Sequence, residues 1–241
     1  MGNDARNGRA RNPKKRSWGA PAATTLPPHA TQSMKKYLVE FIGTFFLVFT
    51  IGSTVIAPGA GSLAPLAIGA SLMVMIFAGG HVSGGHFNPA VTLAVWIRGK
   101  CDTKDVVPYW IAQVAAALVA AWVVGTIKMQ GAAQPLALAS WKPAFLAEFL
   151  FTFALCWVVL NVATAKGTSG NSFYGLAIGM TVMVGAFAVG GVSGGAFNPA
   201  VATGISAMGL SLWSNLPVLL GGELAGAVLA AVAYKAVNGS E

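Results

Sequence analysis

The sequence predicts an all-α membrane protein with six transmembrane helices. Of its 241 residues, 55% are hydrophobic and 9% are charged, whereas soluble domains carry about 25% charged residues. Apolar stretches of the length that crosses about 30 Å of hydrocarbon recur along the chain. They lie at about 37–57, 63–80, 108–127, 143–163, 173–190 and 216–236. This composition and the six long apolar stretches exclude an ordinary soluble domain.

Residues 1–33 differ from this apolar body. They combine six arginines and lysines with four prolines and contain no apolar run, which predicts a disordered basic tail. Residues 34–236 form one membrane domain, and residues 237–241 form a short C-terminus. An arm that binds nucleic acid or anionic lipid is one interpretation of the basic run. We favour a cytoplasmic flank that orients the chain in the bilayer, and we expect no nucleic-acid partner.

The positions of the basic residues predict the orientation of the spans. With the N-terminus inside, thirteen of the fifteen Lys and Arg residues lie on the inner side, and only Lys128 and Lys142 lie outside. Lys and Arg are enriched in cytoplasmic loops. Both termini are therefore expected in the cytoplasm, with the spans in the plasma or inner membrane.

The membrane domain contains an internal repeat. Residues 81–95 (HVSGGHFNPAVTLAV) and 191–205 (GVSGGAFNPAVATGI) are identical at nine of fifteen positions. The repeats extend over about 37–128 and 143–236, with three spans each. An odd number of crossings makes the second repeat enter the membrane from the opposite side, so the repeats are inverted.

Each FNPAV segment is expected to begin a short helix. Asparagine is a favoured N-cap and proline suits the first helical position, so the helices should begin at Pro89 and Pro199. The apolar residues that follow are too few to cross a bilayer. Each segment is therefore predicted to be a re-entrant half-helix, which enters the membrane and is buried against the protein.

The two half-helices are expected to meet in the middle of the membrane. Each N-terminal end carries about half a positive elementary charge, which repels cations, while Asn88 and Asn198 can donate hydrogen bonds to a neutral molecule. The glycine-rich loops before them contain backbone groups that lipid cannot satisfy, so these loops must line a polar path. The predicted backbone lining consists of Gly84, Gly85, His86, Gly194 and Ala196.

The duplicated Asn-Pro-Ala boxes carry a family resemblance. With the EFIGTFFLVF segment that starts at Glu40 and the YWIAQ segment that ends at Gln113, they resemble the aquaporin or major intrinsic protein family over about residues 36–236. The resemblance implies a right-handed bundle of six transmembrane helices plus two re-entrant half-helices, one pore per subunit and a homotetramer. It also implies selection by pore width, hydrogen-bonding groups and positive half-helix ends. The boxes are Asn88, Pro89, Ala90, Asn198, Pro199 and Ala200.

The resemblance also places a selectivity filter, and there the sequence departs from the usual pattern. Similar proteins mostly have an arginine directly after the second box, where this chain has Val201. The family's spacing gives Ile68, Ala186 and Gly195 as the other three filter positions. A small apolar ring predicts a permissive pore for water and for neutral solutes such as glycerol, urea, ammonia or hydrogen peroxide. Ala202, in contrast, stands where glycerol facilitators have an aspartate.

Glu40 and Glu148 occupy equivalent places within spans of the two repeats. Intramembrane carboxylates are candidates for proton relays. The resemblance favours anchoring instead, in which each acid accepts hydrogen bonds from the loop before its half-helix. The offset of 110 residues that relates the two boxes also relates Gln113 to Glu223, to which we assign no function from the sequence.

A passive channel is the leading functional class, with water, small neutral solutes and the lipid bilayer as its partners. A secondary transporter coupled to ions or protons is the alternative, because inverted repeats and half-helices also occur there. No nucleophile–base set or metal-ligand cluster is present, so we expect no enzyme, cofactor or metal site. Cys101 and Cys156 are too few to define a disulfide framework.

Overall fold

The computed structural model describes residues 28–128 and 133–239, with side chains from residue 33 onward. Within these residues the fold is helical, and the only β contact is an isolated bridge between Leu136 and Ser211. Six helices are long and apolar enough to cross a membrane. They are α1 (Pro28–Val55), α2 (Ala64–Ser83), α4 (Thr103–Ile127), α5 (Trp141–Val159), α6 (Tyr174–Ser193) and α8 (Leu216–Asn238).

Two short helices and four single turns complete the described structure. The short helices are α3 (Pro89–Ile97) and α7 (Pro199–Ala207). The single turns are Gly61–Leu63, a π-helical turn at Leu160–Thr164 that extends α5, Lys166–Thr168 and Trp213–Asn215. The six predicted spans and the two half-helices are therefore present in the expected order.

The observed helices differ from the predicted spans mainly at their ends. α1 begins at Pro28, so residues 28–33 are helical and the tail prediction was wrong there, in line with the preference of proline for a first helical turn. The remaining tail, residues 1–27, lies outside the described residues. α4 begins at Thr103, five residues before the apolar stretch, because a helix can continue into polar sequence that hydropathy does not mark. Likewise, α2 and α6 continue through the serines that precede the glycine-rich loops.

The two repeats pack in equivalent ways. α1 packs against α4 in the first repeat and α5 packs against α8 in the second, while α2 and α6 meet between the repeats. At this central contact a Cβ added to Gly179 would lie 2.4 Å from the carbonyl oxygen of Gly69, and the reverse substitution would give 2.6 Å. Only glycine permits this approach of the two backbones.

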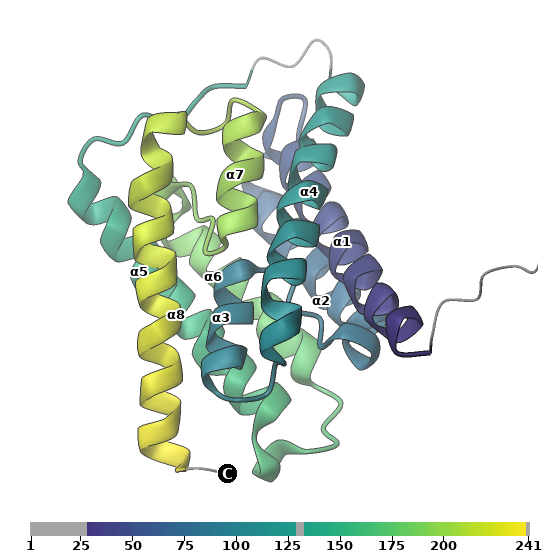
Figure 1. Ribbon diagram of the computed structural model, residues 1–241. Coiled ribbons are helices and arrows are strands. Elements are labelled where there is room, and N and C mark those ends of the chain that lie inside the picture. Colours follow the sequence, from purple (N-terminus) through teal and green to yellow (C-terminus); the bar gives the residue numbers. More distant parts are fainter. Residues whose placement is uncertain (1–27, 129–132, 240–241) are drawn as a thin grey trace, which may run out of the picture.

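Figure 1 shows α3 and α7 near the middle of the bundle, with their first turns facing one another and with α8 on one side and α4 on the other. The start of α1 and the C-terminal end of α8 lie at the same end of the bundle. This placement follows from an even number of crossings.

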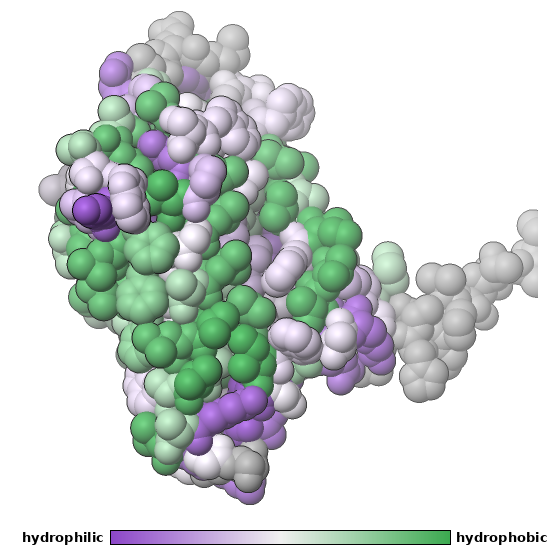
Figure 2. All heavy atoms as spheres, turned by 60° about the vertical axis from the view of Figure 1, so that its left-hand side comes forward, coloured by the Kyte–Doolittle hydropathy of each residue, from purple (hydrophilic) through white to green (hydrophobic). Residues whose placement is uncertain are grey.

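The outward faces of the helices are apolar. Exposed fractions reach 59% for Leu38, 64% for Ile111 and 72% for Trp122. Figure 2 shows hydrophobic residues over the middle of one face and hydrophilic residues toward its ends. A protein that buried its apolar surface from water would not leave such a belt, so we identify it as the lipid-facing surface.

Candidate functional site

The two half-helices begin at the asparagine–proline pairs, as predicted. The backbone of each asparagine is extended, so that its side chain folds back over the first turn. Oδ1 of Asn88 accepts a hydrogen bond from the N–H of Ala90 at 2.8 Å, and Oδ1 of Asn198 accepts one from Ala200 at 2.9 Å. The helix ends are therefore capped by the asparagine oxygens, which leaves the amide nitrogens for other partners.

Those amide nitrogens join the two repeats. Nδ2 of Asn88 donates to the carbonyl of Phe197, and Nδ2 of Asn198 donates to the carbonyl of Phe87, both at 2.8 Å. Phe87 and Phe197 have φ values of 48° and 50°, a conformation rare for bulky residues. Because an amide nitrogen carries two hydrogens, one hydrogen of each asparagine is not used by this crossed pair.

Glu40 of α1 binds the loop before α3. Its Oε1 accepts from Ser83 Oγ at 2.7 Å and from the N–H of His86 at 2.9 Å. Its Oε2 accepts from the N–H of Phe87 at 2.6 Å and from Gln113 Nε2 at 2.8 Å. Four donors thus surround one buried carboxyl group, and three of them, the two backbone amides and the glutamine nitrogen, can only donate.

Glu148 of α5 makes the equivalent contacts in the second repeat. Its Oε1 accepts from Ser193 Oγ at 2.6 Å and from the N–H of Ala196 at 3.1 Å. Its Oε2 accepts from the N–H of Phe197 at 2.6 Å. Both acids are fully buried. Each loop before a half-helix is therefore held by hydrogen bonds to a glutamate inside the protein.

Glu223 is a residue of the site that the sequence analysis left without a function. It lies on α8, and its Oε1 accepts a hydrogen bond from the backbone N–H of Asn198 at 3.1 Å. It is fully buried and lies where the first repeat has Gln113. Its place in the repeat was visible in the sequence, but its contact with Asn198 was not.

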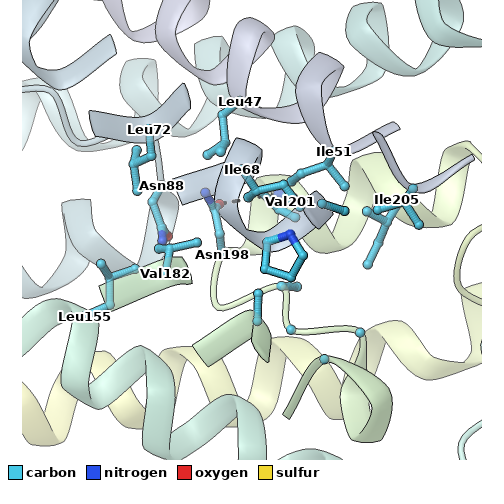
Figure 3. A pocket seen from close by; sticks show the side chains of 18 of the residues that line it. Leu47, Ile51, Ile68, Leu72, Asn88, Leu155, Val182, Asn198, Val201 and Ile205 are labelled. Carbon is cyan, nitrogen blue, oxygen red and sulfur yellow. Dashed lines mark hydrogen bonds between the residues drawn. The ribbon is translucent and has the colours of Figure 1, made fainter. Parts of the chain in front are cut away.

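A cavity of about 340 Å³ extends from the asparagine pair toward the end of the bundle opposite the termini. Figure 3 shows Asn88 and Asn198 at this cavity among leucine, isoleucine and valine side chains. Among the described residues that line it, His86 alone is ionisable. All four predicted filter residues, Ile68, Ala186, Gly195 and Val201, line it, as do Gly85, His86, Gly194 and Ala196.

Some predicted site residues lie away from this cavity. Pro89, Ala90, Pro199 and Ala200 are buried in the first turns of the half-helices and do not line this cavity. Gly84 lines a second hollow of about 510 Å³ at the end of the bundle where the termini lie. This hollow lies at the opposite end of the bundle from the opening of the first cavity.

The loop before α5 contributes lining that the sequence did not predict. Gln134 and Leu136 line the first cavity. The N–H of Leu136 donates to the carbonyl of Leu210 at 2.9 Å, and Asn215 Nδ2 donates to the carbonyl of Leu136 at 2.9 Å. No motif in the loop indicated that it would line the cavity.

The two free cysteines, Cys101 and Cys156, do not line the cavity. Cys156 is buried in α5. Burial and the neighbouring carboxylates of Asp105 and Asp102 raise the pKa of Cys101 to about 11. This thiol is therefore protonated at neutral pH and reacts slowly.

Comparisons with known proteins agree with this geometry. The family model described as "Major intrinsic protein" matches residues 14–81 and 29–234. The "Glycerol uptake facilitator protein-like 6" of Lactiplantibacillus plantarum is 39% identical over 86% of this chain and 100% of its own length. The "Aquaporin AqpM" of Methanothermobacter thermautotrophicus is 34% identical over 83% of this chain and 96% of its own length.

A solved structure shares the fold. The aquaglyceroporin from Plasmodium falciparum superposes with a TM-score of 0.74 at 24% identity, covering 85% of this chain and 96% of that chain. At this identity the likeness concerns the arrangement of the helices. It confirms the predicted architecture of six spans with two re-entrant half-helices.

Replacing Glu40 with methionine should destabilise the protein by about 2 kcal/mol or more, because the N–H groups of His86 and Phe87 lose their partners in a buried loop. Thr44 offers a matched control one turn along α1. It is equally buried, but its hydroxyl has no hydrogen-bond partner, so T44V should change stability by less than about 0.5 kcal/mol. Thermal unfolding of both variants in detergent compares them, and equal effects would contradict the anchoring.

Proposed function

Because the chain belongs to the major intrinsic protein family, we propose that its pore passes neutral solutes larger than water in addition to water. The chain is a multi-pass membrane protein and a passive channel for water and small solutes, not an enzyme. The observation that carries the proposal is that Val201, which stands where similar proteins mostly have an arginine, lines the cavity together with Ile68, Ala186 and Gly195.

The proposed filter consists of the four lining residues Ile68, Ala186, Gly195 and Val201. Alanine and glycine leave room in the ring, and valine adds neither a charge nor a hydrogen-bond donor. The carbon atoms of a solute would contact apolar side chains there, and no charged side chain would obstruct the solute. Pore width and apolar contact then select the solute at this level.

Beyond the ring, Asn88 and Asn198 would orient the solute. Each has one amide hydrogen that is not used in the crossed pair. A water molecule or a hydroxyl group can accept these hydrogens in turn. The positive ends of α3 and α7 meet at the same level, and they would oppose the entry of cations.

The relatives support a permissive pore without fixing the solute. One is named a glycerol uptake facilitator and another an aquaporin. Ala202 departs from the aspartate expected of glycerol facilitators, so glycerol is one of several candidates, with urea, ammonia and hydrogen peroxide. The coupled transporter receives no support, because Glu40 and Glu148 bind loop backbone and do not line the cavity.

We also propose that both termini face the cytoplasm and that the protein is a homotetramer. The excess of Lys and Arg on one side of the spans supports the orientation, and the resemblance to the family supports the tetramer. The mass of the purified protein in detergent, by sedimentation, checks the tetramer.

Protease added to intact cells should leave a tag at the N-terminus uncleaved, whereas protease added to inverted vesicles should remove it. The reason is that the proposed orientation places this end inside the cell. The same tag at the C-terminus should behave alike. Cleavage of either tag on intact cells would refute the proposed orientation.

Liposomes that contain the full chain should swell in gradients of glycerol or urea faster than empty liposomes, and they should shrink faster in an impermeant osmolyte. No ion gradient should be needed, because the solute equilibrates through a passive pore. If water moves while glycerol and urea are both excluded, the wide filter is wrong.

The substitution V201R should reduce solute flux by roughly tenfold or more, an added barrier of about 1.4 kcal/mol per factor of ten. Water flux should fall less, because arginine narrows the ring and adds donors that water can satisfy. V201L is the control, since it adds bulk without charge and should affect solutes only mildly. Stopped-flow light scattering measures both fluxes, and an equal loss of water and solute flux in V201R would contradict this filter assignment.

A further inference from the structure

The anchoring networks of the two repeats share the contacts of their buried glutamates with the loops and differ where the first repeat has Gln113 and the second has Glu223. In each, a buried glutamate accepts from a serine hydroxyl and from two consecutive backbone N–H groups. For Glu40 the fourth donor is the side-chain nitrogen of Gln113. The corresponding residue for Glu148 is Glu223, which as a carboxylate has no hydrogen to donate.

Glu148 and Glu223 lie side by side, since their oxygens accept from the three consecutive N–H groups of residues 196–198. Their carboxyl groups are within hydrogen-bonding reach of one another. The helices that carry them approach closely, since a Cβ added to Gly222 would lie 3.1 Å from the Cβ of Glu148. Both side chains are fully buried. Two carboxylates so close together and away from water would repel each other strongly. A hydrogen bond between the two carboxyl groups requires that one of them holds a proton.

The remaining oxygens indicate which acid holds the proton. Both oxygens of Glu148 accept hydrogen bonds from backbone N–H groups. Glu223 uses Oε1 to accept from the N–H of Asn198, whereas its Oε2 is buried and has no hydrogen-bond donor. A hydrogen on Oε2 would give this oxygen a partner in the carboxylate of Glu148.

We propose that Glu223 retains a proton in the working channel, donates it in a hydrogen bond to Glu148, and accepts the backbone N–H of Asn198. In this form Glu223 is neutral and donates to the buried glutamate of its repeat, as Gln113 donates to Glu40 in the first repeat. Glu148 and Glu223 then bind three consecutive N–H groups, those of residues 196–198. Glu223 is thus a positioning residue, which acts on the path through Asn198.

The proton has an electrostatic consequence for the pore. Without it, a second buried negative charge would lie against the N-terminal end of α7, which carries a partial positive charge. That charge would weaken the barrier to cations at the asparagine pair. A protonated Glu223 holds the loop in place without adding a negative charge that would weaken this barrier.

Infrared spectroscopy of the full chain, in a detergent without carbonyl groups, tests the proposal at neutral pH. The carbonyl stretch of a protonated carboxyl group lies apart from carboxylate bands and shifts in D₂O. Wild type should show this band and E223Q should lose it. Q113E, which creates a second acid pair with Glu40, should gain a band of similar size. Identical spectra of wild type and E223Q in this region would overturn the proposal, whether or not Q113E folds.

Flux measurements separate positioning from simple loss of folding. E223Q should keep water permeability within about twofold of wild type, because glutamine can donate to Glu148 and accept from Asn198. E223L should lose about tenfold or more, since both groups lose a partner. Equal losses in the two variants would contradict the positioning function. The infrared result does not depend on which solutes cross, so failure of the wide-filter proposal would leave it intact.

Discussion

Backbone N–H groups inside a membrane must find partners within the protein. The loops before α3 and α7 cannot satisfy their own N–H groups, because both reverse direction through glycines and end on a phenylalanine with positive φ. Glu40 and Glu148 meet this requirement from helices that pack behind the loops. The capped half-helices, the crossed asparagine bonds and the cavity wall all depend on these two loops holding their shape.

The inverted repeat explains why the same anchoring arrangement appears twice in the chain. Each repeat supplies a glutamate, a serine at the end of a helix and an asparagine, and the crossed bonds between Asn88 and Phe197 and between Asn198 and Phe87 join the copies. Glycines at the contact of α2 with α6 let the copies approach. The repeats therefore depend on each other for the geometry of the path, although each anchors its own loop.

The helices and the half-helix starts could be predicted because their causes are local. Hydropathy marks a span, and an asparagine–proline pair marks the first turn of a helix. The start of α4 was missed because Asp105 belongs to the helix yet is polar, and its bonds to Lys36 and Tyr37 come from a different helix. The lining by Leu136 was missed for the same reason, since its partners, Leu210 and Asn215, lie far along the chain. Contacts between distant segments leave no periodic pattern in a sequence.

Val201, at the proposed filter, and the acid Glu223 both affect how the channel would exclude cations. With Val201 at the proposed filter, the cavity has no fixed cation at that level, and only His86 among the described lining residues can carry a charge. Exclusion of cations then rests on the ends of α3 and α7, whose partial charges are small and close to two buried acids. A proton held between Glu148 and Glu223 limits the second repeat to one negative charge, as glutamine does in the first. The more permissive the filter is toward neutral solutes, the more the discrimination against ions depends on that one proton.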